Sequence, residues 1–244
     1  MNSSVEQLAK YMQMAKYIVF FGGAGVSTES GIPDFRSKDG LYSSQWEDPP
    51  ETVLSRTYFN QKPESFFKFY REKIIHEGAK PNDAHKALAK LEEMGKLKAV
   101  VTQNIDGLHQ MAGSKNVLEL HGSILSNHCM KCHKKYPLEK ILSTKGVPYC
   151  SCGGIIKPDV VLYEEPLDQR VIEKTIKHVR KADLLIIGGT SLTVYPAAAF
   201  VRECMGKIAI INRDATYMDA YADVVIKDKI GETLKKAMEL MQSK

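Results

Sequence analysis

The stretch Tyr17–Arg36 reads YIVFFGGAGVSTESGIPDFR, and it decides the fold class. Its first part, Tyr17–Phe21, is an apolar run bounded by glycines and predicts a buried strand. Three glycines follow within Gly22–Gly25, and the next residues are able to begin a helix. In α/β proteins this order holds a diphosphate, because glycine lets the backbone approach and free N–H groups meet the negative charge. We therefore expect a nucleotide site at this turn.

The glycine turn departs from the dehydrogenase fingerprint, which requires G-x-G-x-x-G. Gly23 and Gly25 are followed by Thr28 where the third glycine would stand. No strand ending in an acid follows about 20 residues later, where a ribose hydroxyl would be held. For the glycines alone, a tight turn without a ligand remains an alternative. The segment Ser30–Arg36 contains glycine, proline, aromatic and charged residues that a phosphate turn alone does not require. The role of this segment therefore decides between a nucleotide site and a turn without a ligand.

Strand and helix patterns alternate along much of the chain. Further strands are predicted at 98–102, 117–120, 159–163, 182–189 and 207–212. Helices are predicted after a capping box at Ser4 and Gln7, at 82–94 and 168–181, and at the C-terminus, where Leu234, Ala237, Met238 and Met241 share one face. This alternation predicts an α/β fold with a Rossmann-like parallel sheet and helices on both faces.

Two insertions interrupt the alternation. Residues 38–80 are aromatic and helical in pattern, and residues 127–157 carry four clustered cysteines. We predict that 1–37, 81–126 and 158–244 form the nucleotide-binding domain. The helical insertion 38–80 and a zinc-binding module at 127–157 would pack together as a smaller domain.

Composition excludes some classes of function. Lys plus Arg exceed Asp plus Glu by 34 − 29 = 5 across 244 residues, a mild and dispersed excess that argues against a specific nucleic-acid partner. No apolar run approaches the roughly 20 residues of a membrane helix. No secretory leader pattern precedes the first helix. We expect a cytoplasmic protein without a membrane partner.

The paired cysteines predict a metal site. Cys129 and Cys132 form one hook, and Cys150 and Cys152 form a second hook after 17 intervening residues. Four thiolates close a tetrahedral zinc site without an open position for water, so the metal would be structural. Disulfides are the alternative. The fifth cysteine, Cys204, is expected to be a buried spectator.

Polar residues follow two of the predicted strands. One predicted buried strand is followed directly by Gln103, Asn104 and Asp106, and the next predicted strand is followed by His121. Ligands of open α/β sheets lie at this edge. A lone histidine is usually structural, but one beside a nucleotide turn and an Asn-x-Asp loop becomes a candidate general base.

Six motifs in this order resemble the sirtuins, which are NAD-dependent protein lysine deacylases. The motifs are Gly23–Arg36, Thr102–His109, His121-Gly122, the four cysteines, Gly189–Leu192 and Ile211-Asn212. The resemblance implies that acyl-lysine oxygen attacks the NAD ribose. It also implies that the products are nicotinamide, free lysine and O-acyl-ADP-ribose.

The resemblance also implies roles for individual residues. His121 would be the general base, with Asn104 and Asp106 as the other catalytic residues; Asp106 and Ile105 would hold the nicotinamide carboxamide, and Phe35 would cover the cationic sugar. The implied NAD-binding set is Ala24, Thr28, Phe35, Arg36, Gln103, Asn104, Ile105, Asp106, His121, Thr190, Ser191, Asn212, Lys229 and Ile230. Acylated lysine peptides would bind as an extended strand between the two lobes.

One position departs from the family pattern. The usual Phe-Gly-Glu reads Tyr163-Glu164-Glu165 here. We expect the extra carboxylate to favour basic residues beside the acylated lysine, unless Glu164 simply points to solvent. The spaced tyrosine and arginine of desuccinylating sirtuins are not evident, since Tyr70 and Arg71 are adjacent. Acetyl or another neutral acyl group is therefore expected.

Three other classes of function compete with deacylation. A zinc-ribbon interaction module on an inert nucleotide fold would bind NAD without turnover, which the presence of His121 argues against. An ADP-ribosyltransferase would cleave the same bond but leave ADP-ribose on a protein side chain. A dehydrogenase is the weakest reading, because the third glycine and the ribose acid are missing.

Overall fold

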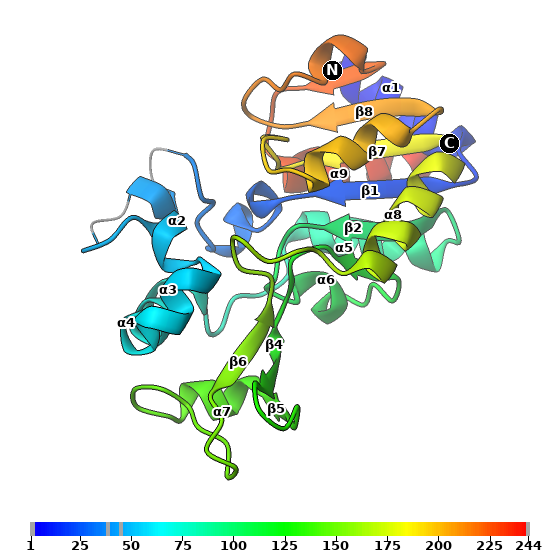
Figure 1. The fold of residues 1–244 in the computed structure, drawn as a ribbon. Helices are drawn as coiled ribbons and strands as arrows, with labels where there is room; N and C mark the ends of the chain where they lie inside the picture. The colour runs from blue at the N-terminus through cyan, green and yellow to red at the C-terminus, as the bar shows by residue number, and fades with distance from the viewer. Residues whose placement is uncertain (1–2, 38–39, 44–45, 243–244) are drawn as a thin grey trace.

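The computed structural model describes residues 3–37, 40–43 and 46–242. Its main domain is built on a six-stranded sheet in the order β3-β2-β1-β7-β8-β9, with each neighbouring pair parallel (Figure 1). The strands are β1 (Ile18–Gly22), β2 (Leu97–Thr102), β3 (Val117–Glu119), β7 (Leu184–Gly188), β8 (Lys207–Ile211) and β9 (Val224–Ile226). The strand order reverses direction at β1 and β7, as in a Rossmann fold. The predicted fold class is confirmed.

Helices cover both faces of this sheet. Alternate side chains of β1 are buried on opposite faces, since Ile18 and Phe20 belong to one hydrophobic cluster whereas Val19 and Phe21 belong to another. The first cluster also contains residues of α1 (Ser3–Met14), α5 (Asp83–Glu93) and α9 (Ile230–Gln242). The second contains residues of α8 (Gln169–Lys181) and of a 3-10 helix at Ala197–Glu203. A strand buried on both faces has no polar alternation, as its continuous apolar sequence predicted.

Local capping explains where two of the helices begin. The Asn82 side chain accepts from the N–H groups of Ala84 and His85, and His85 reciprocates, so a capping box opens α5. Asp168 caps α8 through the N–H groups of Arg170 and Val171. The predicted capping role of Ser4 is wrong, because α1 already begins at Ser3.

The two insertions form a smaller lobe beside the main domain (Figure 1). One contains α2 (Pro50–Val53), α3 (Arg56–Gln61), α4 (Pro63–Phe69) and a π-helical turn at Tyr70–Ile74. The other is an antiparallel sheet in the order β5-β4-β6, made of β4 (Gly122–Cys129), β5 (Lys135–Pro137) and β6 (Ile156–Val160), with α7 (Leu138–Leu142). One hydrophobic cluster joins Phe59, Phe66 and Tyr70 of the helices to Ile124 and Ile156 of this sheet. Shared burial of these side chains holds the insertions together.

Two expectations about local structure are wrong. The strand predicted at 159–163 is β6, which spans Ile156–Val160 and pairs with β4 in the smaller sheet rather than joining the parallel sheet. The glycine turn leads into two 3-10 turns, Ala24–Val26 and Thr28–Ser30, rather than into a helix. The first error arises because periodicity reports local burial and not the pairing partner.

The remaining elements are short. They are α6 (Leu108–Met111) and the 3-10 turns Leu41–Ser43 and Asp219–Tyr221. Within residues 3–37, 40–43 and 46–242, no helix has the length and apolar character needed to cross a membrane.

Candidate active site

Two glycine turns meet where the strand order reverses. The N–H of Gly25, after β1, donates to the carbonyl of Gly189, after β7, at 2.8 Å. A Cβ on Gly25 would lie 2.8 Å from the Gly189 Cα, and a Cβ on Gly189 would lie 2.3 Å from the Val26 nitrogen. Gly189 also has a φ of +59°, which glycine adopts without cost. Side chains at these two positions would separate the turns and fill the space between them.

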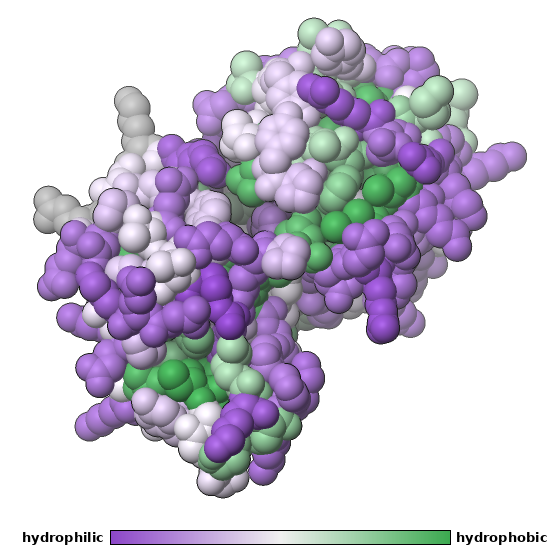
Figure 2. Space-filling model, viewed as in Figure 1, coloured by the Kyte–Doolittle hydropathy of each residue, from purple (hydrophilic) through white to green (hydrophobic). Residues whose placement is uncertain are grey.

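A large cavity, of about 870 Å³, opens beside these turns. Residues that follow all six strands of the main sheet line it: Ala24 after β1, Gln103 after β2, His121 after β3, Gly189 after β7, Asn212 after β8 and Asp228 after β9. This is the crevice in which open α/β sheets bind ligands. Apolar surface lies on the main domain where it meets the smaller lobe (Figure 2).

The cavity brings together residues that are far apart in the sequence. Its lining includes every member of the NAD-binding set implied by the resemblance: Ala24, Thr28, Phe35, Arg36, Gln103, Asn104, Ile105, Asp106, His121, Thr190, Ser191, Asn212, Lys229 and Ile230. Their separate roles stay predictions. Their convergence on one cavity of this size, around turns that only glycine fits, is compatible with a dinucleotide.

A hydrogen-bond network fixes the Asn-x-Asp loop. The Ser27 hydroxyl donates to Asp106 Oδ2 at 2.6 Å and accepts from Asn104 Nδ2 at 3.0 Å. Asp106 Oδ1 accepts the N–H of Leu108 at 2.9 Å. Ser27 and Asn104 are both buried. Ser27 is not among the residues identified from the sequence, because its partners lie 77 and 79 residues away and no local pattern indicates these contacts.

His121 is held in one orientation. Its Nδ1 lies 3.0 Å from the Gln103 carbonyl oxygen, which only accepts, so Nδ1 carries the proton and Nε2 has a free lone pair. Burial lowers the pKa of His121 below its ordinary 6.5, although the bond to Gln103 acts in the opposite direction. At neutral pH the imidazole is therefore uncharged. A neutral imidazole on the cavity wall is able to accept a proton.

The aromatic wall of the cavity includes Phe35. Its ring meets that of Tyr42 edge to face at 5.6 Å, and the Arg36 guanidinium lies over the Tyr42 ring at 5.3 Å. Tyr42 and Tyr163 join their hydroxyls at 2.6 Å. Burial, followed by this hydrogen bond, strongly raises the pKa of Tyr42, so the hydroxyl stays protonated.

A second pair of histidines lies behind the site. His85 and His109 are fully buried, with ring centroids 4.7 Å apart, and neither lines the cavity. Burial lowers the pKa of His85 to about 4 and that of His109 to about 3, so both are neutral. His109 belongs to the Thr102–His109 motif, yet its place is structural.

The four predicted cysteines form one cluster. Their Sγ atoms all lie within 4.8 Å of one another, with Cys129 to Cys152 at 3.4 Å and Cys132 to Cys150 at 3.6 Å. Zinc–sulfur bonds of about 2.3 Å in a tetrahedron place sulfurs about 3.8 Å apart. The Cys152 N–H and then the Tyr136 hydroxyl lower the pKa of Cys150 to about 5, which favours thiolate. The donor set fits a structural zinc ion.

The segment Tyr163–Glu165 lies on the cavity rim beside the smaller lobe. Glu164 has a φ of +75°, in the left-handed region that favours glycine. Its Oε2 accepts from the N–H and the hydroxyl of Thr57 at 2.9 and 2.7 Å. The side chain thus bonds to the first turn of α3, while Glu164 itself stays exposed to solvent.

Comparisons with known proteins agree with this geometry. The model of the Sir2 family matches residues 23–196. An NAD-dependent protein deacetylase of Clostridium perfringens is 57% identical over 244 residues, covering 98% of this chain and 100% of the relative. One of Clostridium acetobutylicum is 57% identical over 236 residues, covering 95% and 96%.

Solved structures extend the similarity to the fold. A Sir2 enzyme whose structure addresses mechanism and regulation superposes with a TM-score of 0.91 at 41% identity, covering 100% of this chain and 99% of that one. A Sir2 complex with a p53 peptide and NAD+ superposes at 0.86 with 40% identity, covering 98% of both chains. On sequence, fold and the arrangement of the cavity, the chain belongs to the Sir2 family, the sirtuins.

Proposed function

We propose that this protein is an NAD-dependent protein lysine deacetylase. The observation that carries the proposal is the placement of His121, with Nδ1 fixed by the Gln103 carbonyl, on the same cavity as Asn104 and Asp106. The names of the relatives, NAD-dependent protein deacetylases at 57% identity, support it. NAD is a co-substrate, and zinc is structural.

The reaction cleaves NAD rather than oxidising or reducing it. The acetyl-lysine carbonyl oxygen bonds to the anomeric carbon while the bond to nicotinamide breaks, and nicotinamide leaves with the electron pair. His121 then accepts the proton of a ribose hydroxyl, so that the ribose oxygen attacks the imidate carbon. Water completes the release of free lysine and O-acetyl-ADP-ribose. The unprotonated Nε2 of His121 suits this step at neutral pH.

The loop after β2 would receive nicotinamide. Asp106 and the Ile105 backbone are proposed to hold its carboxamide, with Asn104 orienting the ribose or a water molecule. The bonds from Ser27 keep Asp106 and Asn104 in place before the substrate enters. Phe35 is proposed to cover the cationic sugar, because an aromatic face attracts positive charge.

The remaining cavity residues would hold the rest of NAD. Arg36, Ala24, Thr28 and Gln103 are proposed for the diphosphate and ribose. The adenosine end is proposed to contact Thr190, Ser191, Asn212 and the Lys229-Ile230 backbone. We propose the division predicted from the sequence, with NAD mainly on the sheet domain, except that residues 122–126 and 158–160 belong to β4 and β6 of the smaller sheet. The separate hydrophobic clusters of the two parts support this division.

The acylated peptide would bind as an extended strand between the lobes, with Tyr163–Glu165 on one side and Leu192–Val194 on the other. Related Sir2 structures hold a p53 peptide with NAD+ and a propionylated peptide. Glu164 is proposed to favour basic residues beside the acylated lysine, since its carboxylate lies on the rim of the cavity.

A small neutral acyl group suits this cavity. Arg71 donates to the carbonyls of Ile141 and Gly146 in the smaller lobe and is not part of the cavity lining. Tyr70 is buried. This adjacent pair therefore offers no cationic partner for a succinyl carboxylate, which supports acetyl or another neutral acyl group as the substrate group.

A comparison of products separates this function from its rivals. The protein would be incubated with NAD and an acetyl-lysine peptide, and the products separated by liquid chromatography with mass detection. Deacetylation yields free lysine peptide and nicotinamide. ADP-ribose attached to the peptide would indicate a transferase, NADH absorbance a dehydrogenase, and NAD binding without products an interaction module.

A further inference from the structure

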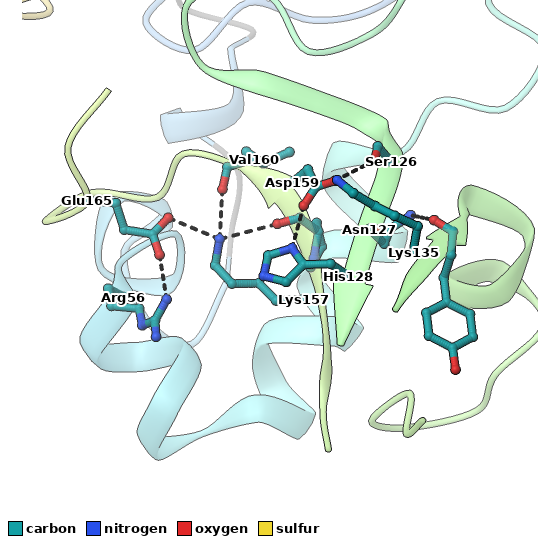
Figure 3. A network of polar contacts seen from close by, with 11 residues as sticks. Arg56, Ser126, Asn127, His128, Lys135, Lys157, Asp159, Val160 and Glu165 are labelled. Carbon is teal, nitrogen blue, oxygen red and sulfur yellow. Dashed lines mark hydrogen bonds and ion pairs between the residues drawn. The ribbon is translucent and has the colours of Figure 1, made fainter. Parts of the chain in front are cut away.

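A buried lysine lies at the junction of the zinc-bearing sheet and the cavity rim. Lys157 is on β6, and its residue is 5% exposed. Its Nζ donates to the carbonyls of Pro158 and Val160 at 3.2 and 2.9 Å and to Glu165 Oε2 at 3.0 Å (Figure 3). An ammonium group has three N–H donors. All three therefore have acceptors, and one of them is the carboxylate of the rim segment.

Glu165 is equally well engaged. Its Oε2 also accepts the N–H of Leu162 at 2.9 Å, and its Oε1 accepts from Arg56 Nη1 at 2.7 Å. Burial opposes ionisation, but the Leu162 N–H, Arg56 and Lys157 together outweigh it and lower the pKa of Glu165. The carboxylate thus joins a strand of the smaller sheet, a helix of the other insertion and the segment that follows β6.

The same rim segment is bound through its backbone. The Tyr163 N–H donates to the Leu54 carbonyl and the Arg56 N–H donates to the Tyr163 carbonyl, both at 3.0 Å. Glu164 adds its two bonds to Thr57. Residues 163–165 thus lie along residues 54–57, with a side-chain or backbone bond at every step.

A buried ion pair is weak evidence for added stability, because desolvation offsets the attraction; its better-supported role is to select one arrangement. We infer that Lys157 and Arg56, acting through Glu165, are positioning residues for the acylated peptide. They hold the backbone of the rim segment Tyr163–Glu165 in the position and orientation in which it contacts the substrate peptide. The inference rests on the proposed function, which places the peptide at this segment.

Steady-state kinetics test the inference. Lys157→Met keeps the length of the side chain but removes the charge and its three hydrogen bonds. It should raise KM for the acetyl-lysine peptide at least tenfold and leave KM for NAD within twofold. Lys157→Arg, which keeps a cation beside Glu165, should restore most of the affinity. Arg56→Met should raise the peptide KM by a smaller factor, since Lys157 still holds Glu165.

Lys135→Met is a control for the loss of an ion-paired lysine elsewhere on the same sheet. Lys135 belongs to the same sheet and pairs with Asp159 at 3.1 Å, away from Glu165 (Figure 3). This variant should keep the wild-type peptide KM. If peptide KM in a folded Lys157→Met protein stayed within twofold of wild type, or rose in step with KM for NAD, the inference would be overturned.

Amide hydrogen exchange decides the matter independently of turnover. In Lys157→Met the amides of Leu162 and Tyr163 should exchange at least tenfold faster, whereas that of Val101 in β2 should keep its rate. Unchanged exchange at Leu162 and Tyr163 would contradict the positioning role. A wild-type protein that failed to deacetylate would contradict the proposed function, and the exchange rates would still test whether Lys157 fixes the rim segment.

Discussion

Ser27 offers a sharp test of how the site is organised. In Ser27→Ala, Asp106 loses the 2.6 Å bond from the serine hydroxyl and Asn104 loses its acceptor. A hydrogen bond to a charged group contributes about 1.5–3 kcal/mol. Asp106 retains the Leu108 N–H, so we expect a loss of about 2 kcal/mol in the free energy of unfolding, within that range. In a chain of this size that corresponds to a Tm lower by about 4–8 °C.

The same loss should appear in catalysis. Because Asp106 and Asn104 are proposed to meet nicotinamide and ribose, about 2 kcal/mol of lost transition-state stabilisation lowers kcat/KM for NAD by about 30-fold. Unfolding would be followed by circular dichroism, and turnover by nicotinamide release at saturating peptide. The two measurements separate stability from chemistry.

Ser114→Ala is the matched control. Ser27 is 1% exposed and Ser114 is 4% exposed, so burial is nearly equal. Among the described residues, the Ser114 hydroxyl has no hydrogen-bond partner, so removing it should be neutral or stabilising. Equal effects of the two substitutions on Tm and kcat/KM would refute the reasoning, since they would show that the bonds of Ser27 contribute nothing.

Three further predictions follow from the site. Since burial lowers the pKa of His121, the midpoint of the acid limb of kcat/KM, where the base becomes protonated, should lie below pH 6.5; a midpoint above 6.5 in the pH–rate profile would contradict this. Elemental analysis should find one zinc per chain, and Cys150→Ser should lose this zinc together with more than about 5 °C in Tm. The control Cys204→Ser should keep the zinc and the wild-type Tm. Equal zinc loss in the two variants would exclude the four-cysteine cluster as the zinc site. Acetyl peptides with basic flanking residues should show a kcat/KM several-fold above acidic ones, and Glu164→Gln should abolish the difference; equal turnover by wild type would remove the proposed role of that carboxylate.

Much of the fold follows from local sequence. The apolar run before Gly22 and the similar run before Gly189 each predict a strand that ends at a glycine turn, and both do. The cysteine hooks predict a metal site because their spacing is a local property. Each inference needs only neighbours along the chain.

Other features depend on contacts that local sequence does not report. The apolar residues near Val160 predict a strand, but which sheet it joins is decided by pairing with β4, more than 30 residues earlier. The strand β9, Val224–Ile226, has only three residues and no distinct periodicity. The role of Ser27 becomes visible only in the folded structure, where β1 and β2 are neighbours and Asp106 lies within hydrogen-bond distance.

Glu164 illustrates both what the sequence reveals and what only the structure shows. Its substitution for the family glycine is visible in the sequence, and the positive φ explains why glycine is usual there. The sequence does not show that the carboxylate turns to Thr57 and caps α3. A residue that departs from the usual pattern is thus accommodated by bonds to a segment more than 100 positions away.

The most direct test of the account is a time course of products with the wild-type protein and His121→Ala. Wild type should form nicotinamide, free lysine peptide and O-acetyl-ADP-ribose in equal amounts, quantified by mass spectrometry from NAD and an acetyl-lysine peptide. The variant, shown to be folded by circular dichroism, should form no O-acetyl-ADP-ribose above background. Equal amounts of O-acetyl-ADP-ribose from both proteins would contradict the assignment of His121 as the general base.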